Sequence, residues 1–514
     1  MTNPAQAMRM LITYAVCIPM AIFVGYLLTD PMDYGTMGIF GLIALLLLSP
    51  FFIKYHYPFL IFGLACPVTC FFLLGKPPMA QVVVILSLGI AVIERTLNSE
   101  KRFISVPAMT WPLLYTVAMV VFTAEMTGGI GLHALGGDTG GGKKYLSLFI
   151  GVATFFALTS RPIPKARRGF YIALFMLPAA LGAIGDLFPF LPSPLNYINL
   201  LFPPTQQVIS GDVALGVTRF SAFGSTAGVF ATYMIAKHGL RGIFRMDKPI
   251  RCLTVMVLLV LTMLGGYRTV LITYIMIGGM LFFMEGLYRT RVMPVAILAL
   301  IVGGSLAVPF SDKLPYTFQR AMSFIPGLKF DSQVLADGEN SKQWRETMWH
   351  DLWPKVPQYL LLGKGYSLSR EDFEYMGGGA FEGLGVGQDA SQQGLAIAGD
   401  YHSGPLSTLM PFGIWGAISY LWAALASIFI MYRNFRYGDL EVKHFNAFLF
   451  ALSLQAFIGY FFLIGAYSEA IGGIAKLTGI SIALNWGVCG PKPAPAPVSS
   501  VKTLPNPRAR PLPA

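Results

Sequence analysis

Long apolar segments alternate with short polar ones along nearly the whole chain. A hydrocarbon core about 30 Å thick requires roughly 20 residues of helix, so this pattern predicts membrane-spanning helices. Several segments are short or abut one another, and the sequence therefore predicts an all-α, polytopic integral membrane protein with twelve to fourteen transmembrane helices. The segments are 11–28, 36–53, 58–75, 80–94, 107–124, 145–159, 169–186, 220–236, 252–267, 269–287, 292–308, 407–431, 444–464 and 470–488.

The distribution of basic residues predicts the orientation of these segments. The first one follows Arg9 without a small-residue cleavage site, which indicates a retained helix with a cytoplasmic N-terminus. Threading from there places 23 of the 37 Lys and Arg residues on the cytoplasmic side and 14 outside, eight of them in one segment too long for the charge rule. Both termini are then cytoplasmic. The richest cytoplasmic loops are 161–168, 237–251, 289–291 and 433–443.

The same pattern divides the chain into four parts. Residues 1–308 hold about eleven transmembrane helices, and residues 309–406 form one large outer loop, predicted to be partly helical, with twelve of the 25 acidic residues. Residues 407–488 hold the C-terminal transmembrane helices. The Pro-rich residues 489–514 predict a disordered cytoplasmic tail, because they contain few core-forming side chains.

Composition supports the membrane interpretation and argues against a nucleic-acid-binding protein. Of the 514 residues 55% are hydrophobic and only 12% charged, whereas soluble domains carry about 25% charged residues. A net charge of +12 would suggest nucleic-acid binding in a soluble protein, but here it reflects topology, and no nucleic-acid partner is expected. The five cysteines lie in or beside the apolar segments and form neither a disulfide framework nor a zinc pattern.

Arginines at the outer ends of apolar segments are candidates for anion binding. Residues 343–353 predict an amphipathic helix with Trp344, Met348 and Trp349 on one face and Arg345 inside that apolar arc. Arg345 would either extend to lipid phosphates or bind a buried anion. Arg268, in Gly-Gly-Tyr-Arg-Thr, and Arg219, in Gly-Val-Thr-Arg-Phe, also lie at outer boundaries. Three guanidinium groups there would suit a diphosphate, although a helix-end anchor explains a single arginine equally well.

One histidine stands out among six. His402 lies in Asp400-Tyr401-His402-Ser403-Gly404-Pro405, where the long outer loop returns to the membrane. A neutral imidazole there could take a proton from a sugar hydroxyl, with Asp400 close enough in sequence to orient it. A structural role is the alternative, and it is the interpretation we prefer for His350, which falls on the polar face of the amphipathic helix.

The order of these elements resembles the O-antigen ligase and polymerase superfamily over residues 215–430. Members carry a Gly-Ser-Arg type turn, an Arg…Trp…Pro-Leu-Leu-Gly-x-Gly stretch and a His-Asn before a late span. Arg268 is similar to the first motif, Arg345 with Trp349 and Gly363/Gly365 to the second, and His402 to the third. Arg219, followed by Phe-Ser-Ala-Phe-Gly, resembles the family's Arg…Gly-x-Phe. Ser403 departs from the pattern, since asparagine is usual there.

The resemblance implies glycosyl transfer on the periplasmic side of the bacterial inner membrane. The donor would be a glycan on undecaprenyl diphosphate and the acceptor a lipid A core sugar or another glycan. Arg268, Arg345 and Arg219 would hold the diphosphate, and His402 would activate the acceptor hydroxyl. Such a direct displacement inverts the anomeric centre and needs no metal or other cofactor.

The alternative class is a flippase or transporter of lipid-linked oligosaccharides. Such a protein also has twelve to fourteen spans, but typically shows charges within spans, related halves and short loops on both sides. This chain instead concentrates its polar residues in one outer loop, which favours an enzyme over a transporter and over a membrane scaffold. The sequence does not separate ligase from polymerase.

Overall fold

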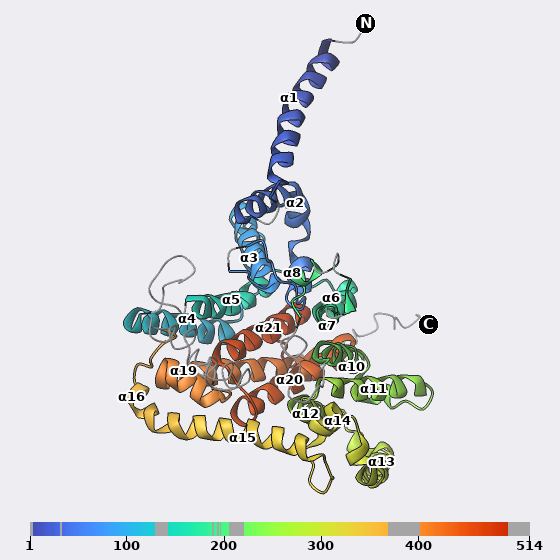
Figure 1. Cartoon of the computed structure of the whole chain (residues 1–514). Helices are drawn as coiled ribbons and strands as arrows, with labels where there is room; N and C mark the ends of the chain where they lie inside the picture. Colours follow the sequence, from blue (N-terminus) through green and yellow to red (C-terminus); the bar gives the residue numbers. More distant parts are fainter. Residues whose placement is uncertain are drawn as a thin grey trace, which may run out of the picture.

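The described part of the protein is built from helices. The computed structural model describes residues 4–30, 33–73, 75–128, 142–187, 190–192, 195, 197–204, 220–367 and 401–491. The structure is 78% helical and has no strands among these residues, which confirms the all-α fold class. In Figure 1, α1 extends away from the rest of the molecule, whose other helices pack side by side.

The longer helices follow the predicted apolar segments closely. They are α1 (Pro4–Leu27), α2 (Tyr34–Gly63), α3 (Met79–Leu97), α4 (Pro107–Thr127), α5 (Gly142–Thr159), α6 (Arg168–Met176), α10 (Ser221–Ile243), α11 (Pro249–Thr262), α12 (Arg268–Met284), α13 (Val292–Ala307), α19 (Gly404–Tyr437), α20 (Lys443–Phe462) and α21 (Tyr467–Asn485). The shorter helices are α7 (Ala183–Asp186), α8 (Ile198–Leu201), α14 (Tyr316–Met322) and α16 (Val356–Tyr359), and the long outer segment also contains α15 (Ser332–Leu352).

Two predicted segments differ from the structure. The kink of α2 at Tyr55 lies at the expected boundary between segments 36–53 and 58–75, but the second helical part ends at Gly63. The following residues form a turn and then an isolated bridge between Thr69 and Pro78, with Thr69 N–H donating to Leu201 O at 2.8 Å. The segment 169–186 is divided into α6, a 3-10 turn at Leu177–Gly182 and α7. Apolar composition alone therefore overstated helix length at both places.

Five helical stretches in the described residues are long and apolar enough to cross a membrane. They are Met79–Leu97, Pro107–Thr127, Lys165–Asp186, Gly404–Tyr437 and Leu440–Phe462. Shorter apolar helices, among them Pro249–Gly265 and Arg268–Met284, accompany them. The protein is thus an integral membrane protein, while the count of twelve to fourteen spans remains a prediction.

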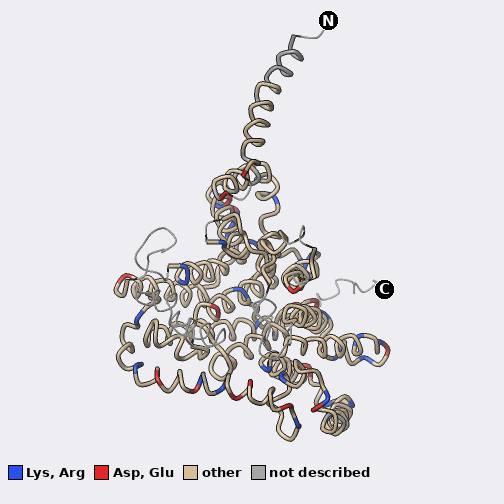
Figure 2. The backbone as a smooth tube through the Cα atoms, in the orientation of Figure 1, with Lys and Arg blue, Asp and Glu red and all other residues tan. Residues whose placement is uncertain are grey.

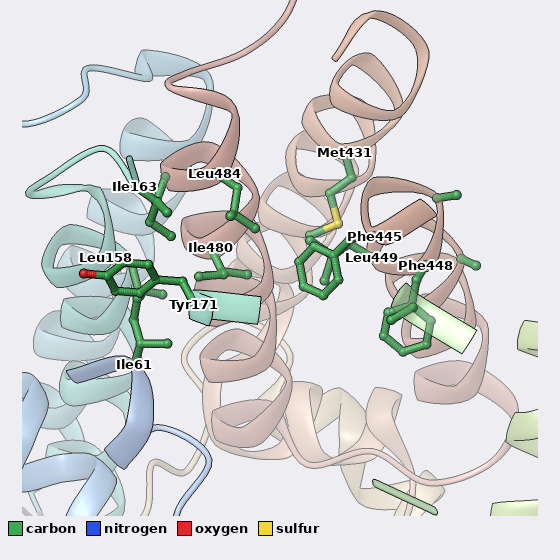
Figure 3. Packing of buried hydrophobic residues seen from close by; sticks show 14 of the residues in the cluster. Ile61, Leu158, Ile163, Tyr171, Met431, Phe445, Phe448, Leu449, Ile480 and Leu484 are labelled. Carbon is green, nitrogen blue, oxygen red and sulfur yellow. The ribbon is translucent and has the colours of Figure 1, made fainter. Parts of the chain in front are cut away.

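The α21 helix forms the centre of the main hydrophobic core. It packs most extensively against α5 and also contacts α19 and α20. Figure 3 shows Ile480 and Leu484 of α21 between Leu158 and Tyr171 on one side and Met431 and Phe445 on the other. The N-terminal and C-terminal apolar regions are therefore packed against each other around this helix.

Polar contacts between helix connections can be sorted into two groups. One group is joined by the pairs Arg161–Glu94, Arg168–Asp439 and His444–Glu285. The other is joined by Asp186 with the Ala222 N–H and by Arg320 with the Gly266 carbonyl. Figure 2 shows charged residues at helix ends and along α15, whereas most helix interiors are uncharged. This is the arrangement expected of a bundle with two polar faces.

Candidate functional site

The Gly265-Gly266-Tyr267-Arg268 turn places Arg268 at the first residue of α12. Gly266 has φ of +67°, a left-handed conformation that ends the preceding 3-10 turn and that glycine adopts without steric cost. Tyr267 is extended, and α12 begins immediately after it. The guanidinium of Arg268 is thereby held at a helix end instead of inside an apolar segment.

Arg320 and Asp337 hold this turn against the outer helices. Arg320 of α14 donates from Nη1 to Gly266 O at 3.0 Å and from Nε to the Asp337 carboxylate. Asp337 belongs to α15 and also accepts from Tyr316 Oη at 3.2 Å. Both side chains of the Arg320–Asp337 pair are 15% exposed. The pair therefore links α12, α14 and α15 at the position of Arg268.

Arg268 packs directly against α15. A Cβ on Gly338 would lie 2.5 Å from Nη2 of Arg268, so glycine at 338 leaves the space that the guanidinium occupies. Arg268 also interacts electrostatically with Arg320, Asp337 and Arg345. Three arginines and one aspartate thus share this region, and cationic charge exceeds anionic charge.

One face of α15 connects this arginine region to His402. Gly338, Arg345 and Trp349 are spaced at i, i+7 and i+11 and lie on the same face. At the far end, Trp349 Nε1 donates to Tyr401 O at 2.9 Å. Gly338 and Trp349 are separated by about 16 Å along the helix axis, with Arg345 between them. Burial lowers the pKa of Arg345, which agrees with its position on the inner face.

The position of His402 is fixed by its neighbours. Tyr401 is 2% exposed and packs with Met348, Leu406 and Met410, and its N–H donates to Ser407 Oγ at 3.2 Å. His402 has φ of +48° and is partly exposed. A left-handed backbone at a non-glycine residue requires support from its surroundings, and such residues cluster at functional sites. Ser403 is the N-cap of α19 but makes no side-chain capping bond.

The Gly363-Lys364-Gly365 motif docks onto the kinked start of α19. Lys364 N–H donates to Met410 O at 2.8 Å and Gly365 N–H to Pro411 O at 3.0 Å. A Cβ on Gly363 would lie 2.2 Å from Pro411 O, so no larger residue fits. The outer segment therefore holds the helix that follows His402 at two places, through Trp349 and through this motif.

A cavity of about 380 Å³ is lined by residues of α12, α19, α20 and α21. They include Thr269, the residue after Arg268, and Tyr460 and Gly465. Tyr460 contacts α19 so closely that a Cβ on Gly404 would lie 2.2 Å from its carbonyl oxygen. Glu469 also lines the cavity. The lining thus includes the sequence neighbour of Arg268 and a tyrosine that packs against Gly404, two residues after His402.

Three of the residues singled out from sequence belong to one structural unit. Arg268, Arg345 and His402 are connected through α15, and Trp349 has a defined role there. Arg219 and Asp400 lie outside the described residues. Sequence reasoning missed Arg320 and Asp337, which are 17 residues apart and form no recognisable motif. Within the described residues, no group of three or more His, Cys, Asp or Glu side chains could hold a metal ion.

Comparison with known families gives one match. Residues 253–421 match a family model described as O-antigen ligase. This part of the chain is therefore similar to O-antigen ligases. The match covers 169 residues, about a third of the chain, and includes Arg268, Arg345 and His402. Searches of curated proteins and of solved structures return no match.

The similarity supports a general class of reaction. O-antigen ligases are enzymes of the glycosyltransferase type that act on lipid-linked glycans and acceptors in general. The matched region runs from α11 to the middle of α19 and contains α14 and α15 with the Arg320–Asp337 pair. The residues that sequence reasoning missed are therefore part of the O-antigen ligase domain.

Proposed function

We propose that this protein is an inverting, metal-independent glycosyltransferase that moves a glycan from undecaprenyl diphosphate to a lipid A core or glycan acceptor on the periplasmic side. The observation that carries this proposal is the inner face of α15. It contacts Arg268 at Gly338, bears Arg345, and binds Tyr401 beside His402 through Trp349. Cationic groups from α12 and α15 and a candidate base before α19 are thus connected through one helix.

The arginines would bind the diphosphate of the donor. A guanidinium donates two parallel hydrogen bonds to phosphate oxygens, and its charge stabilises the leaving diphosphate without a metal ion. Arg268 and Arg345 are the residues proposed for this role. Arg320 is engaged with Asp337 and Gly266, so it positions the turn. We also assign Arg219 to the diphosphate, since it lies two residues before the start of α10 in sequence.

His402 would act as the general base. Its imidazole would accept the proton of the acceptor hydroxyl as that oxygen attacks the anomeric carbon and the bond to the diphosphate breaks. Attack opposite the leaving group inverts the anomeric centre. Asp400 is proposed to orient the imidazole. The 380 Å³ cavity between Thr269 and Tyr460 is the proposed place of the reacting sugar.

The decisive experiment measures transfer from a lipid-diphosphate glycan donor by purified protein in detergent. We expect His402→Ala and Arg268→Ala to lower the rate by about 100-fold or more, because general bases and charge stabilisation each contribute on that scale. The matched control is His350→Ala, whose side chain is 91% exposed on the outer face of α15. Its rate should equal that of the wild type, and a chelator should leave all rates unchanged.

Full activity of both His402→Ala and Arg268→Ala would refute the site, and absence of transfer by the wild-type protein would favour a transporter. Ligase and polymerase are distinguished by deletion in the native host, followed by gel analysis of surface glycans. Loss of all capped chains with accumulated lipid-linked polymer indicates a ligase. Caps of a single repeat indicate a polymerase.

A further inference from the structure

Lys476 lies at the middle of α21, nine residues from either end of the helix. At 1.5 Å per residue it is about 13 Å from each end. The helix is the centre of the main core, and Ala475 and Ile480 beside Lys476 are fully buried. A lysine at such depth in an apolar bundle costs several kcal/mol and by default indicates a function.

No anionic group in the described part of the chain neutralises Lys476. The ion pairs and side-chain hydrogen bonds formed by the described residues do not include its ammonium. The nearest acidic residue on its own helix, Glu469, is two turns away and lines the other cavity. The described residues therefore supply no acidic partner for the ammonium group of Lys476.

Lys476 instead lines a cavity of about 510 Å³ around the first half of α12. The polar lining consists of Lys476, Thr232, Thr269, Thr273 and Tyr274. The remaining wall is apolar and includes Phe175, Met176, Ile277, Phe448, Leu452 and Leu477. One cation with several hydroxyl groups, facing a wide hydrocarbon surface, is complementary to an anion attached to an apolar chain.

Thr273 provides a second polar group in the lining of the same cavity. Its Oγ1 accepts from Gln455 Nε2 at 3.3 Å, which leaves the hydroxyl proton available for an anionic oxygen. Thr273 lies five residues after Arg268 on α12, about 7 Å deeper along the axis. Thr269 and Thr273 line both this cavity and the 380 Å³ cavity next to Arg268. The two spaces therefore share the Thr269–Thr273 face of α12.

We propose that the 510 Å³ cavity binds a phosphorylated lipid, with its phosphate held by Lys476 and Thr273 and its hydrocarbon chain against Phe175, Ile277 and Leu452. The proposal concerns binding alone and does not depend on glycan transfer. The phosphate could belong to a polyprenyl phosphate or to a membrane glycerophospholipid, since both combine the same anion with an apolar chain.

The test measures lipid retention by native mass spectrometry of the purified full-length protein. The probes are polyprenyl monophosphate, uncharged polyprenol, phosphatidylglycerol and inorganic phosphate. We expect polyprenyl monophosphate to bind the wild type, and Lys476→Met to weaken it about tenfold or more, because a charge-assisted hydrogen bond is lost. Lys476→Arg should retain binding. Lys443→Met, an exposed lysine at the start of α20, is the matched control and should bind as the wild type does.

The remaining probes identify the source of the lipid and can overturn the proposal. Equal competition by phosphatidylglycerol assigns the site to membrane phospholipids, and weak competition assigns it to polyprenyl phosphates. Equal binding of polyprenol and polyprenyl monophosphate, or unchanged binding by Lys476→Met, would refute the phosphate contact. Inorganic phosphate binding as tightly as the lipid would refute the role of the apolar wall.

Stability provides a second readout. Without added lipid, Lys476→Met should unfold at a higher temperature than the wild type, because an uncompensated charge is removed. A lower unfolding temperature would mean that the lysine stabilises the fold itself, which contradicts the proposal. If Lys476→Met fails to fold, Thr273→Val provides the same lipid-binding test. We expect Thr273→Val to lose binding of polyprenyl monophosphate as well.

Discussion

For Arg345, a conservative substitution can separate the role of charge from that of hydrogen-bond geometry. It lies on the buried face of α15, and burial lowers its pKa, but a guanidinium stays protonated at neutral pH. If it binds the diphosphate through two parallel hydrogen bonds, lysine cannot replace it. We predict that Arg345→Lys lowers the rate of transfer by about tenfold and Arg345→Ala by more.

The control for Arg345 lies on the same helix. Lys342 is exposed and pairs with Glu339 at 3.7 Å and Glu346 at 3.8 Å. Because exposed pairs of this kind contribute little, Lys342→Ala should leave the rate unchanged. An Arg345→Lys variant as active as the wild type would show that only charge matters at this position.

The candidate site residues were easier to predict from sequence than the residues that hold them in position. The sequence indicated Arg268, Arg345 and His402 because an ionisable group at an apolar boundary is unusual. It gave no indication of Asp337, since a carboxylate in an acidic loop is ordinary until Arg320 is seen to donate to it. Gly363 was noticed as part of a motif, but its reason, the closeness of Pro411 O, depends on a contact 48 residues away.

One hydrogen bond between α15 and the residue before His402 can be removed selectively. Trp349→Phe retains an aromatic ring but loses the Nε1 donor to Tyr401 O. A neutral hydrogen bond contributes about 1 kcal/mol, so the unfolding temperature should change little. Transfer should fall several-fold because the backbone next to His402 is held less firmly.

Trp353 provides the matched aromatic control for Trp349. It lies at the end of the same helix, is 47% exposed, and is not part of the small core around Tyr401. Trp353→Phe is therefore expected to transfer at the wild-type rate. Equal losses in both variants would mean that aromatic bulk, and not the Trp349 hydrogen bond, is required.

Helix positions were predictable where hydrophobic runs end at charges or prolines, as at Pro107 and Pro249. Residues 64–73 failed this rule because apolar residues suit irregular segments as well as helices. Their turns and the isolated Thr69–Pro78 bridge are accompanied by the Thr69–Leu201 hydrogen bond, which joins distant parts of the chain. Likewise, the sequence predicted a helix over 343–353, whereas α15 begins at Ser332, capped by Asp331 Oδ1 accepting from Gln333 N–H.

On the scale of the whole molecule, Arg168 joins the N-terminal and C-terminal regions. It is 2% exposed and donates to Asp439 Oδ2 at 2.8 Å. This hydrogen bond and the charge of Arg168 lower the pKa of Asp439 below its ordinary value. The carboxylate therefore stabilises the fold above its unfolded pKa, near 3.9, and loses that contribution as the pH falls through the lower folded value.

Replacement of Asp439 should consequently have a pH-dependent effect. We predict that Asp439→Asn lowers the free energy of unfolding by about 1 kcal/mol at pH 7, a small value because the carboxylate is 46% exposed. The difference from the wild type should shrink as the pH falls below about 4. Thermal unfolding in detergent at several pH values measures it, and a difference independent of pH would contradict the assignment.

The two groups of helix connections lead to a prediction about orientation. We propose that the group containing α15 and His402 faces the periplasm and that the group containing Arg168 and Asp439 faces the cytoplasm. The reason is that the Arg168–Asp439 group holds most of the basic short loops. In a cysteine-free background, a cysteine at His350 should react with a membrane-impermeant maleimide added to intact cells with a permeabilised outer membrane. A cysteine at Lys443 should react only after the inner membrane is opened. The reverse pattern would place the arginines and His402 on the side where a periplasmic acceptor cannot reach them, and would refute the proposed reaction along with the topology.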